Sequence, residues 1–177
     1  MTDIRPATAD DLPRIEQIYD AIHTAEETGA ASVGWARGVY PTRASAQAAL
    51  DDGALFVLTD GGVLVAAGRI DRTQVPVYAQ VPWQYAAPPE QVLVLHTLAV
   101  DPAAAGRGYG TQFVRFYAQR ARALGCTVLR IDTNAKNTRA RRLYARLGFR
   151  EAAIVTCTFN GIAGVSLACL EKRLDAE

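Results

Sequence analysis

An apolar run of nine residues, Val92 to Val100, leads directly into a glycine-rich loop. Only His96 and Thr97 interrupt this run, and its length is typical of a buried strand. Three glycines in alternate positions follow where a helical pattern begins, namely Gly106, Gly108 and Gly110. A buried strand that passes through a glycine-rich turn into a helix predicts an α/β fold.

The start of this helix is the strongest candidate for a binding site. A helix N-terminus offers unpaired N–H groups and a partial positive charge, and both suit phosphate oxygens. Glycines there let the backbone approach a ligand without Cβ atoms in the way. The pattern predicts a loop that binds a phosphate-bearing molecule. The alternative is a turn that is rich in glycine only for tight packing.

Two nucleotide-binding fingerprints can be compared with this loop, and neither fits. In a dinucleotide fingerprint the third glycine would fall at Thr111, although Asp132 lies about where a ribose-binding acid is expected. The five residues from Asp101 to Ala105 are also too many for a tight first turn. A P-loop needs a lysine before its Ser or Thr, and Gly110 precedes Thr111.

Helical periodicity appears in four places. The first helix is expected from a cap at Asp10 or Asp11 to Gly29, and the second over residues 42–50. The third runs from the glycine-rich loop to Gly125, with an inner face of Phe113, Tyr117, Ala121 and Leu124. The fourth ends at Gly148, and its apolar stripe is Ala140, Leu143, Tyr144 and Leu147.

Strands are expected at residues 2–5, 55–59, 63–70, 92–100, 126–131, 149–159 and 165–170. The sequences Asp60-Gly61-Gly62 and Asn160-Gly161 are typical of turns between neighbouring strands. Gly68 inside a strand indicates a bulge. Four prolines between residues 73 and 90 exclude a helix there and allow only an edge strand. One mixed sheet flanked by helices can contain all of these elements.

Length and composition predict one soluble domain, residues 1–177, because half of the 177 residues are hydrophobic. The net charge of +1 gives no overall attraction to nucleic acid or to a membrane, so neither partner is expected. No signal peptide or membrane span is recognisable, and a cytoplasmic location is expected. The three cysteines lack C-x-x-C spacing, so core positions are expected for them, with no disulfide framework and no metal.

Two motifs in the second half of the chain resemble those of the GNAT N-acetyltransferase superfamily. The first is Leu98-Ala99-Val100 followed by Ala105-Gly106-Arg107-Gly108-Tyr109-Gly110, and the second is Asn137-x-x-Ala140-x-x-Leu143-Tyr144-x-x-x-Gly148-Phe149. The opening Ile-Arg-Pro-Ala-Thr-x-x-Asp-Leu at 4–12 is also similar to the start of many members. The loop departs from the family pattern at Ala105, where Gln or Arg is usual, and Arg107 is the nearest replacement.

The resemblance implies a fold and a cofactor. It implies one mixed, mostly antiparallel twisted sheet flanked by helices, with two central strands splayed apart for acetyl-CoA. The pantetheine arm would meet Asn137 and the main chain of Leu98, Ala99 and Val100. The pyrophosphate would be held by the backbone of Gly106, Arg107, Gly108, Tyr109, Gly110 and Thr111.

Tyr144 and His96 are the candidate catalytic residues. In the family, the tyrosine that matches Tyr144 donates a proton to the leaving thiolate, which agrees with ordinary pKa values of about 10 and 8.5 for the two groups. Some members have a histidine at the position of His96, and a neutral imidazole can accept a proton from an ammonium group. A core role for either side chain is the alternative. Glu90 and Asp101, acting through water, are weaker candidates for the base.

The acceptor is expected near two aromatic segments, and the weak candidates for binding it are Trp35, Tyr40, Tyr78 and Trp83. Arginines at 139, 142 and 146 share a helical face, which can be a solvated face, a contact for the 3′-phosphate of coenzyme A or, least favoured, an RNA site.

The expected function is transfer of an acetyl group from acetyl-CoA to a primary amine of a small or amino-acid-like molecule. Transfer would be direct, in a ternary complex, because no nucleophilic Cys or Ser beside a base is recognisable. The alternative is a catalytically silent acetyl-CoA-binding or sensor module with the same fold. The resemblance leaves a monomer and a homodimer open.

Overall fold

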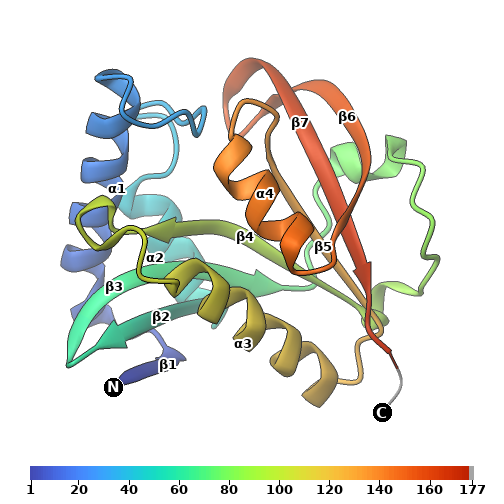
Figure 1. Ribbon diagram of the computed structural model, residues 1–177, viewed down its shortest axis with the longest axis horizontal. Coiled ribbons are helices and arrows are strands. Elements are labelled where there is room, and N and C mark those ends of the chain that lie inside the picture. The colour runs from blue at the N-terminus through green and yellow to red at the C-terminus, as the bar shows by residue number, and fades with distance from the viewer. Residues whose placement is uncertain (176–177) are drawn as a thin grey trace.

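The computed structural model describes residues 1–175, so residues 176 and 177 of the expected domain lie outside the described part. Seven strands form one sheet in the order β1-β2-β3-β4-β5-β7-β6 (Figure 1). The β4–β5 pair is parallel and all other neighbouring pairs are antiparallel. The prediction of a single mixed, mostly antiparallel sheet is confirmed.

The strands follow the sequence pattern with small shifts at their ends. Their bounds are β1 (Thr2–Pro6), β2 (Leu55–Asp60), β3 (Val63–Asp71), β4 (Val92–Val100), β5 (Val128–Asn134), β6 (Arg150–Phe159) and β7 (Ile162–Arg173). β5 begins later than expected because the Cys126 N–H group bonds to the Ala121 carbonyl at 2.9 Å and so still belongs to the preceding helix end.

The helices are α1 (Leu12–Glu27), α2 (Arg43–Asp51), α3 (Tyr109–Ala123) and α4 (Thr138–Arg146). All four agree with the expected positions. The expected burial of Leu124 is wrong, since that residue is 40% exposed. It caps α3, and Gly125 with φ +71° then turns the chain away from the sheet.

The two faces of the sheet are covered by different elements. Helices α3 and α4 pack on one face, where β4 contributes Leu93 and Leu95 (Figure 1). Helices α1 and α2 cover part of the other face. Beside them, the proline-rich segment packs on the alternate β4 residues, Val92 and Val94. The alternation of these four residues follows from the two-residue period of a strand.

The proline-rich segment between β3 and β4 forms two short 3₁₀ turns, Pro76–Gln80 and Pro89–Gln91, and has no α-helix, as predicted. Glu171 of β7 attaches the segment to the sheet. Its fully buried carboxylate accepts the N–H groups of Gln84 and Tyr85 at 2.8 and 3.1 Å. This carboxylate therefore supplies two of the hydrogen bonds that hold the segment on the sheet.

A bulge interrupts the β3–β4 pairing at the level of Gly68. Ala67 pairs with Ala99, but Arg69 pairs with His96, so β4 contains one extra residue there. Thr97 has the positive φ of +52°. The irregularity expected from Gly68 is therefore present, with the extra residue on the opposite strand.

Candidate active site

The central strands β4 and β5 separate halfway along their length. They pair from Val92 to Leu95 and from Val128 to Ile131. Both strands continue beyond these residues, to Val100 and Asn134, without pairing with each other. The splay that the resemblance implied is therefore present.

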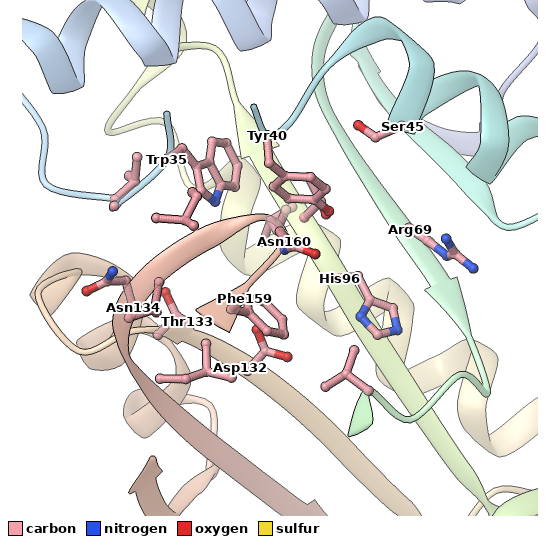
Figure 2. Close-up of a pocket in the computed structure, with 18 of the residues that line it drawn as sticks. Trp35, Tyr40, Ser45, Arg69, His96, Asp132, Thr133, Asn134, Phe159 and Asn160 are labelled. Atoms are coloured by element: carbon pink, nitrogen blue, oxygen red, sulfur yellow. The ribbon is translucent and has the colours of Figure 1, made fainter. Parts of the chain in front are cut away.

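A cavity of about 300 Å³ opens at this gap (Figure 2). Three consecutive residues of β4, His96 to Leu98, and three of β5, Asp132 to Asn134, line it. In a regular strand alternate residues face opposite sides of the sheet. Consecutive residues reach the same cavity because the bulge disturbs β4 and because the edges of both strands face the gap.

Tyr144 lies on α4 and contributes to the cavity wall, although only 4% of its surface is exposed. Its ring packs against Phe149 with 6.0 Å between the ring centres. Burial, and then the negative charge of Asp132, raise the pKa of Tyr144 above its ordinary value. The phenol is therefore protonated at neutral pH and is able to donate its proton to a group in the cavity.

His96 of β4 lines one side of the cavity (Figure 2). Its Nε2 is 3.1 Å from the Thr73 carbonyl oxygen and 3.3 Å from Oδ1 of Asp71. Both neighbours are acceptors, so Nε2 carries a hydrogen, and in the neutral form of the ring Nδ1 is the acceptor. This arrangement gives the histidine the form that a general base requires.

Asp71 was not among the residues expected at the site. Burial alone would raise its pKa, but hydrogen bonds from His96, Arg69 and the Thr73 N–H group outweigh burial and hold the pKa below its ordinary value. Asp71 is therefore ionised at neutral pH, and it orients the His96 ring. The alternative bases lie elsewhere, since Asp101 bonds to Arg14 and neither Asp101 nor Glu90 lines the cavity.

The glycine-rich loop leaves its backbone open at the start of α3. The first backbone bond of the helix runs from the Gln112 N–H group to the Gly108 carbonyl at 3.0 Å. Within residues 1–175, the N–H groups of residues 106 to 111 have no backbone partner. Gly106 and Gly108 have φ values of +83° and +80°, and no atom lies within 4 Å of the Cβ that either position would carry. This backbone fits a diphosphate.

The other expected cofactor residues occupy different positions around the gap. Leu98 and Asn137 line the cavity, and Asn137 also caps α4 by accepting the Ala140 N–H group at 3.1 Å. The Ala99 side chain is fully buried, and that of Tyr109 is buried with its hydroxyl on Asp60 at 2.6 Å. Only the main-chain groups of Ala99 and Tyr109 are therefore available to bind a ligand.

Of the four expected acceptor residues, the structure brings two to the cavity. Trp35 and Tyr40 line it, with their ring centres 6.5 Å apart in an edge-to-face arrangement. Tyr78 and Trp83 do not line it. They pack on each other under the sheet, and the Tyr78 hydroxyl donates to Oδ2 of Asp132 at 2.7 Å.

Two further cavity residues, Asp132 and Phe159, were missed as site residues. Asp132 was considered only for a ribose contact. The available signal was its position one residue beyond the apolar part of a strand, where side chains often reach a site. Phe159 precedes the Asn160-Gly161 turn and gave no signal of its own.

The fold and the site are typical of a class of proteins. Its members bind an elongated ligand with a diphosphate group in the gap of an open sheet. The sequence model described as acetyltransferase (GNAT) family matches residues 13–149, which is most of the chain. The chain therefore belongs to the GNAT acetyltransferase family, which uses acetyl-CoA. No curated protein sequence matches the chain.

Solved structures agree with this fold. A GNAT-family acetyltransferase from Streptococcus agalactiae has a TM-score of 0.82 at 21% identity, over 99% of this chain and 96% of that one. The yncA protein of Salmonella typhimurium, solved with its cofactor acetyl-CoA, has a TM-score of 0.68 at 20% identity, over 99% and 95%. The ribosomal-protein-S18-alanine N-acetyltransferase of Escherichia coli has a TM-score of 0.70 at 19% identity, over 100% and 96%. At these identities the likeness shows the fold.

Gly108→Ala is expected to weaken the binding of coenzyme A about tenfold, measured by titration calorimetry. A side chain at φ +80° costs on the order of 1–2 kcal/mol, so the loop will move to a conformation in which its N–H groups no longer converge. Gly125→Ala is the matched control, because Gly125 has a similar φ of +71° and equally open space at the other end of α3. Equal affinities of the two variants would contradict a role of the loop in binding.

Within the described residues, the helices include none that is long and apolar enough to cross a membrane.

Proposed function

We propose that the chain is an acetyl-CoA-dependent N-acetyltransferase that acetylates a primary amine of a small molecule by direct transfer in a ternary complex. The observation that carries the proposal is the cavity at the β4–β5 gap. A phenol, Tyr144, and an imidazole with a free acceptor nitrogen, His96, both line this one cavity.

Acetyl-CoA supplies the acetyl group as a thioester, so that a C–N bond forms to the amine as the C–S bond breaks. The open backbone of residues 106 to 111 would hold the pyrophosphate. The unpaired edge of β4 near Leu98 would receive the amide groups of the pantetheine arm, as an edge strand receives a peptide.

Two side chains of the protein would move protons. Nδ1 of His96 accepts a proton from the acceptor ammonium group, which frees the lone pair of the amine. The hydroxyl of Tyr144 donates a proton to the sulfur that leaves, and it regains one from the acylated nitrogen through water. One proton is released to the solvent for each amide formed, so the protein ends in its starting state.

The proposal is tested by following the release of thiol from acetyl-CoA with a panel of primary amines. We expect turnover with at least one class of amine and formation of the acetylated product, identified by mass spectrometry. Binding of coenzyme A without turnover of any amine would instead support the silent binding module. The single domain, the cytoplasmic location and the oligomeric state remain predictions.

His96→Gln is expected to lower kcat/KM about 10²-fold at neutral pH and to remove the decline of the rate towards acidic pH, because the variant has no imidazole to protonate. The measurement is the pH profile of kcat/KM for the amine, from initial rates below saturation. As a control, the affinity for coenzyme A should not change. If the variant had the same pH profile as the native enzyme, the base that accepts the proton of the ammonium group would be water or a carboxylate instead of His96.

A further inference from the structure

The Asp132 carboxylate is a half-buried charge that the steps described above do not use. It follows Ile131, the last residue of β5 that pairs with β4, and it lines the cavity. Within residues 1–175 it receives one hydrogen bond, from the Tyr78 hydroxyl at 2.7 Å, and it forms no ion pair. A carboxylate that lies partly out of water and has no cation beside it is unfavourable, and such groups concentrate at functional sites.

The other charged groups at the cavity are already paired. Arg69 donates to Asp71 at 2.6 Å and to Asp52 at 3.2 Å. His96 directs its Nε2 at Asp71 and the Thr73 carbonyl. Asp132 is therefore the one carboxylate lining the cavity whose charge no described cation balances. A cationic partner for this carboxylate would therefore have to come from outside the described residues.

The rest of the cavity lining combines aromatic and aliphatic side chains with uncharged polar ones, such as Thr97, Thr133 and Asn160. Figure 2 shows Trp35 and Tyr40 together at one end, and Asp132 with Phe159 and His96 at the other. Val33, Ile162 and Leu167 complete the apolar wall. The loop with Trp35 lies directly on the end of β5, since a Cβ at Gly34 would meet the Asn134 amide at 2.2 Å. Such a wall suits an apolar substituent and offers no free cation to a carboxylate.

We propose that Asp132 binds the ammonium group of the acceptor, and that the acceptor is a primary amine with an apolar or aromatic substituent and no carboxylate beside the amine. The proposal rests on the proposed function, because it names the substrate class of the same site. An α-amino acid would bring its own carboxylate close to Asp132, and like charges that near each other repel strongly in a buried site.

The experiment compares amines with the amino acids that differ from them by one carboxylate. The pairs are isopentylamine and leucine, phenethylamine and phenylalanine, and tyramine and tyrosine. We expect the native enzyme to release thiol from acetyl-CoA with a kcat/KM at least 10²-fold higher for the amine of the preferred pair. In the Asp132→Asn variant, kcat/KM for that amine should be at least tenfold lower than in the native enzyme. The ratio of kcat/KM between the amine and its amino acid should fall to a few-fold. Asp10→Asn is the control, since it removes one exposed negative charge away from the cavity.

Folding of the Asp132→Asn variant is checked by its melting temperature. Burial raises the pKa of Asp132 in the folded chain, while the Tyr78 hydrogen bond and the charge of His96 act in the opposite direction. The folded state then binds the proton more tightly than the unfolded state, so stability falls as pH rises from about 4 through the folded pKa. Asparagine carries no charge, so the variant does not lose this stability at neutral pH. The melting temperature of the variant should therefore equal or exceed that of the native protein.

The outcomes separate the two proposals. Equal rates within the pairs, or a preference for the amino acids, would overturn the role of Asp132 and leave acetyl transfer intact. If no compound releases thiol, the proposed function fails. Calorimetry of phenethylamine and phenylalanine with the coenzyme A complex then decides whether the cavity prefers the amine, and equal binding or no binding of both overturns the inference.

Discussion

Replacing Tyr144 with phenylalanine is expected to lower kcat by 10²-fold or more, with the affinity for coenzyme A unchanged. The variant keeps the ring that packs on Phe149 and removes only the hydroxyl. Without a donor the sulfur must leave as a thiolate in a cavity where burial and Asp132 already disfavour negative charge. General acids of this kind contribute about 10²–10⁴-fold to the rate.

The measurement is steady-state thiol release with calorimetry of coenzyme A alongside it. Tyr85→Phe serves as a control, because it also removes a phenolic hydroxyl but lies in the proline-rich segment, outside the cavity. If the Tyr144→Phe enzyme kept the native kcat, Tyr144 would be a packing residue only. Water would then be the proton donor to the sulfur.

Replacing Glu171 with alanine is expected to destabilise the protein by roughly 3–5 kcal/mol, because two N–H groups lose their hydrogen bonds to a charged acceptor, each of which contributes about 1.5–3 kcal/mol. The carboxylate accepts the N–H groups of Gln84 and Tyr85 and pairs with Arg150 at 2.5 Å. Alanine would leave both N–H groups without their acceptor under the sheet. A loss of this size corresponds to a melting temperature lower by about 10 °C for a chain of this length.

Glu151→Ala is the matched comparison on the neighbouring strand. Glu151 also pairs with an arginine, Arg141 at 2.6 Å, but a third of its side chain is exposed. Surface pairs contribute about 0–1 kcal/mol, so this variant should melt within a few degrees of the native protein. If thermal denaturation showed equal losses for the two variants, the proline-rich segment would not depend on Glu171 for its attachment.

The parts of the site that the sequence predicted are those set by local chain geometry. Gly106 and Gly108 indicate an open turn because few other residues adopt a positive φ. Tyr144 and His96 were expected from the resemblance to the family, whose motifs each occupy a short stretch of the sequence. In each case the informative neighbours lie within a few residues along the chain, so no knowledge of the tertiary fold was needed.

Residues that depend on distant contacts were not predicted. Asp71 reaches His96 because β3 pairs antiparallel with β4 across a bulge, and a shift of register by one residue would remove that contact. Phe159 reaches the cavity through the position of the β6–β7 hairpin beside β5. These relations depend on strand order and register, which a single sequence specifies weakly.

The aromatic residues expected to bind the acceptor illustrate a different limit. Composition cannot rank Trp35 above Trp83, because aromatic side chains fill cores as readily as they line pockets. Trp83 packs over Arg130, with the guanidinium 4.2 Å from the ring centre, and its indole N–H donates to the Tyr78 carbonyl at 3.0 Å. Those contacts give Trp83 a structural role that its sequence neighbourhood could not distinguish from binding.

The β4–β5 gap has a consequence for the stability of the protein in a cell. A ligand that filled the gap would bind only the folded sheet, so its occupancy and folding would be thermodynamically coupled. At a concentration one hundred times its dissociation constant, a ligand that binds only the folded state adds about 2.7 kcal/mol to stability. The amount of intact enzyme that escapes proteolysis would therefore rise and fall with the supply of acyl donor.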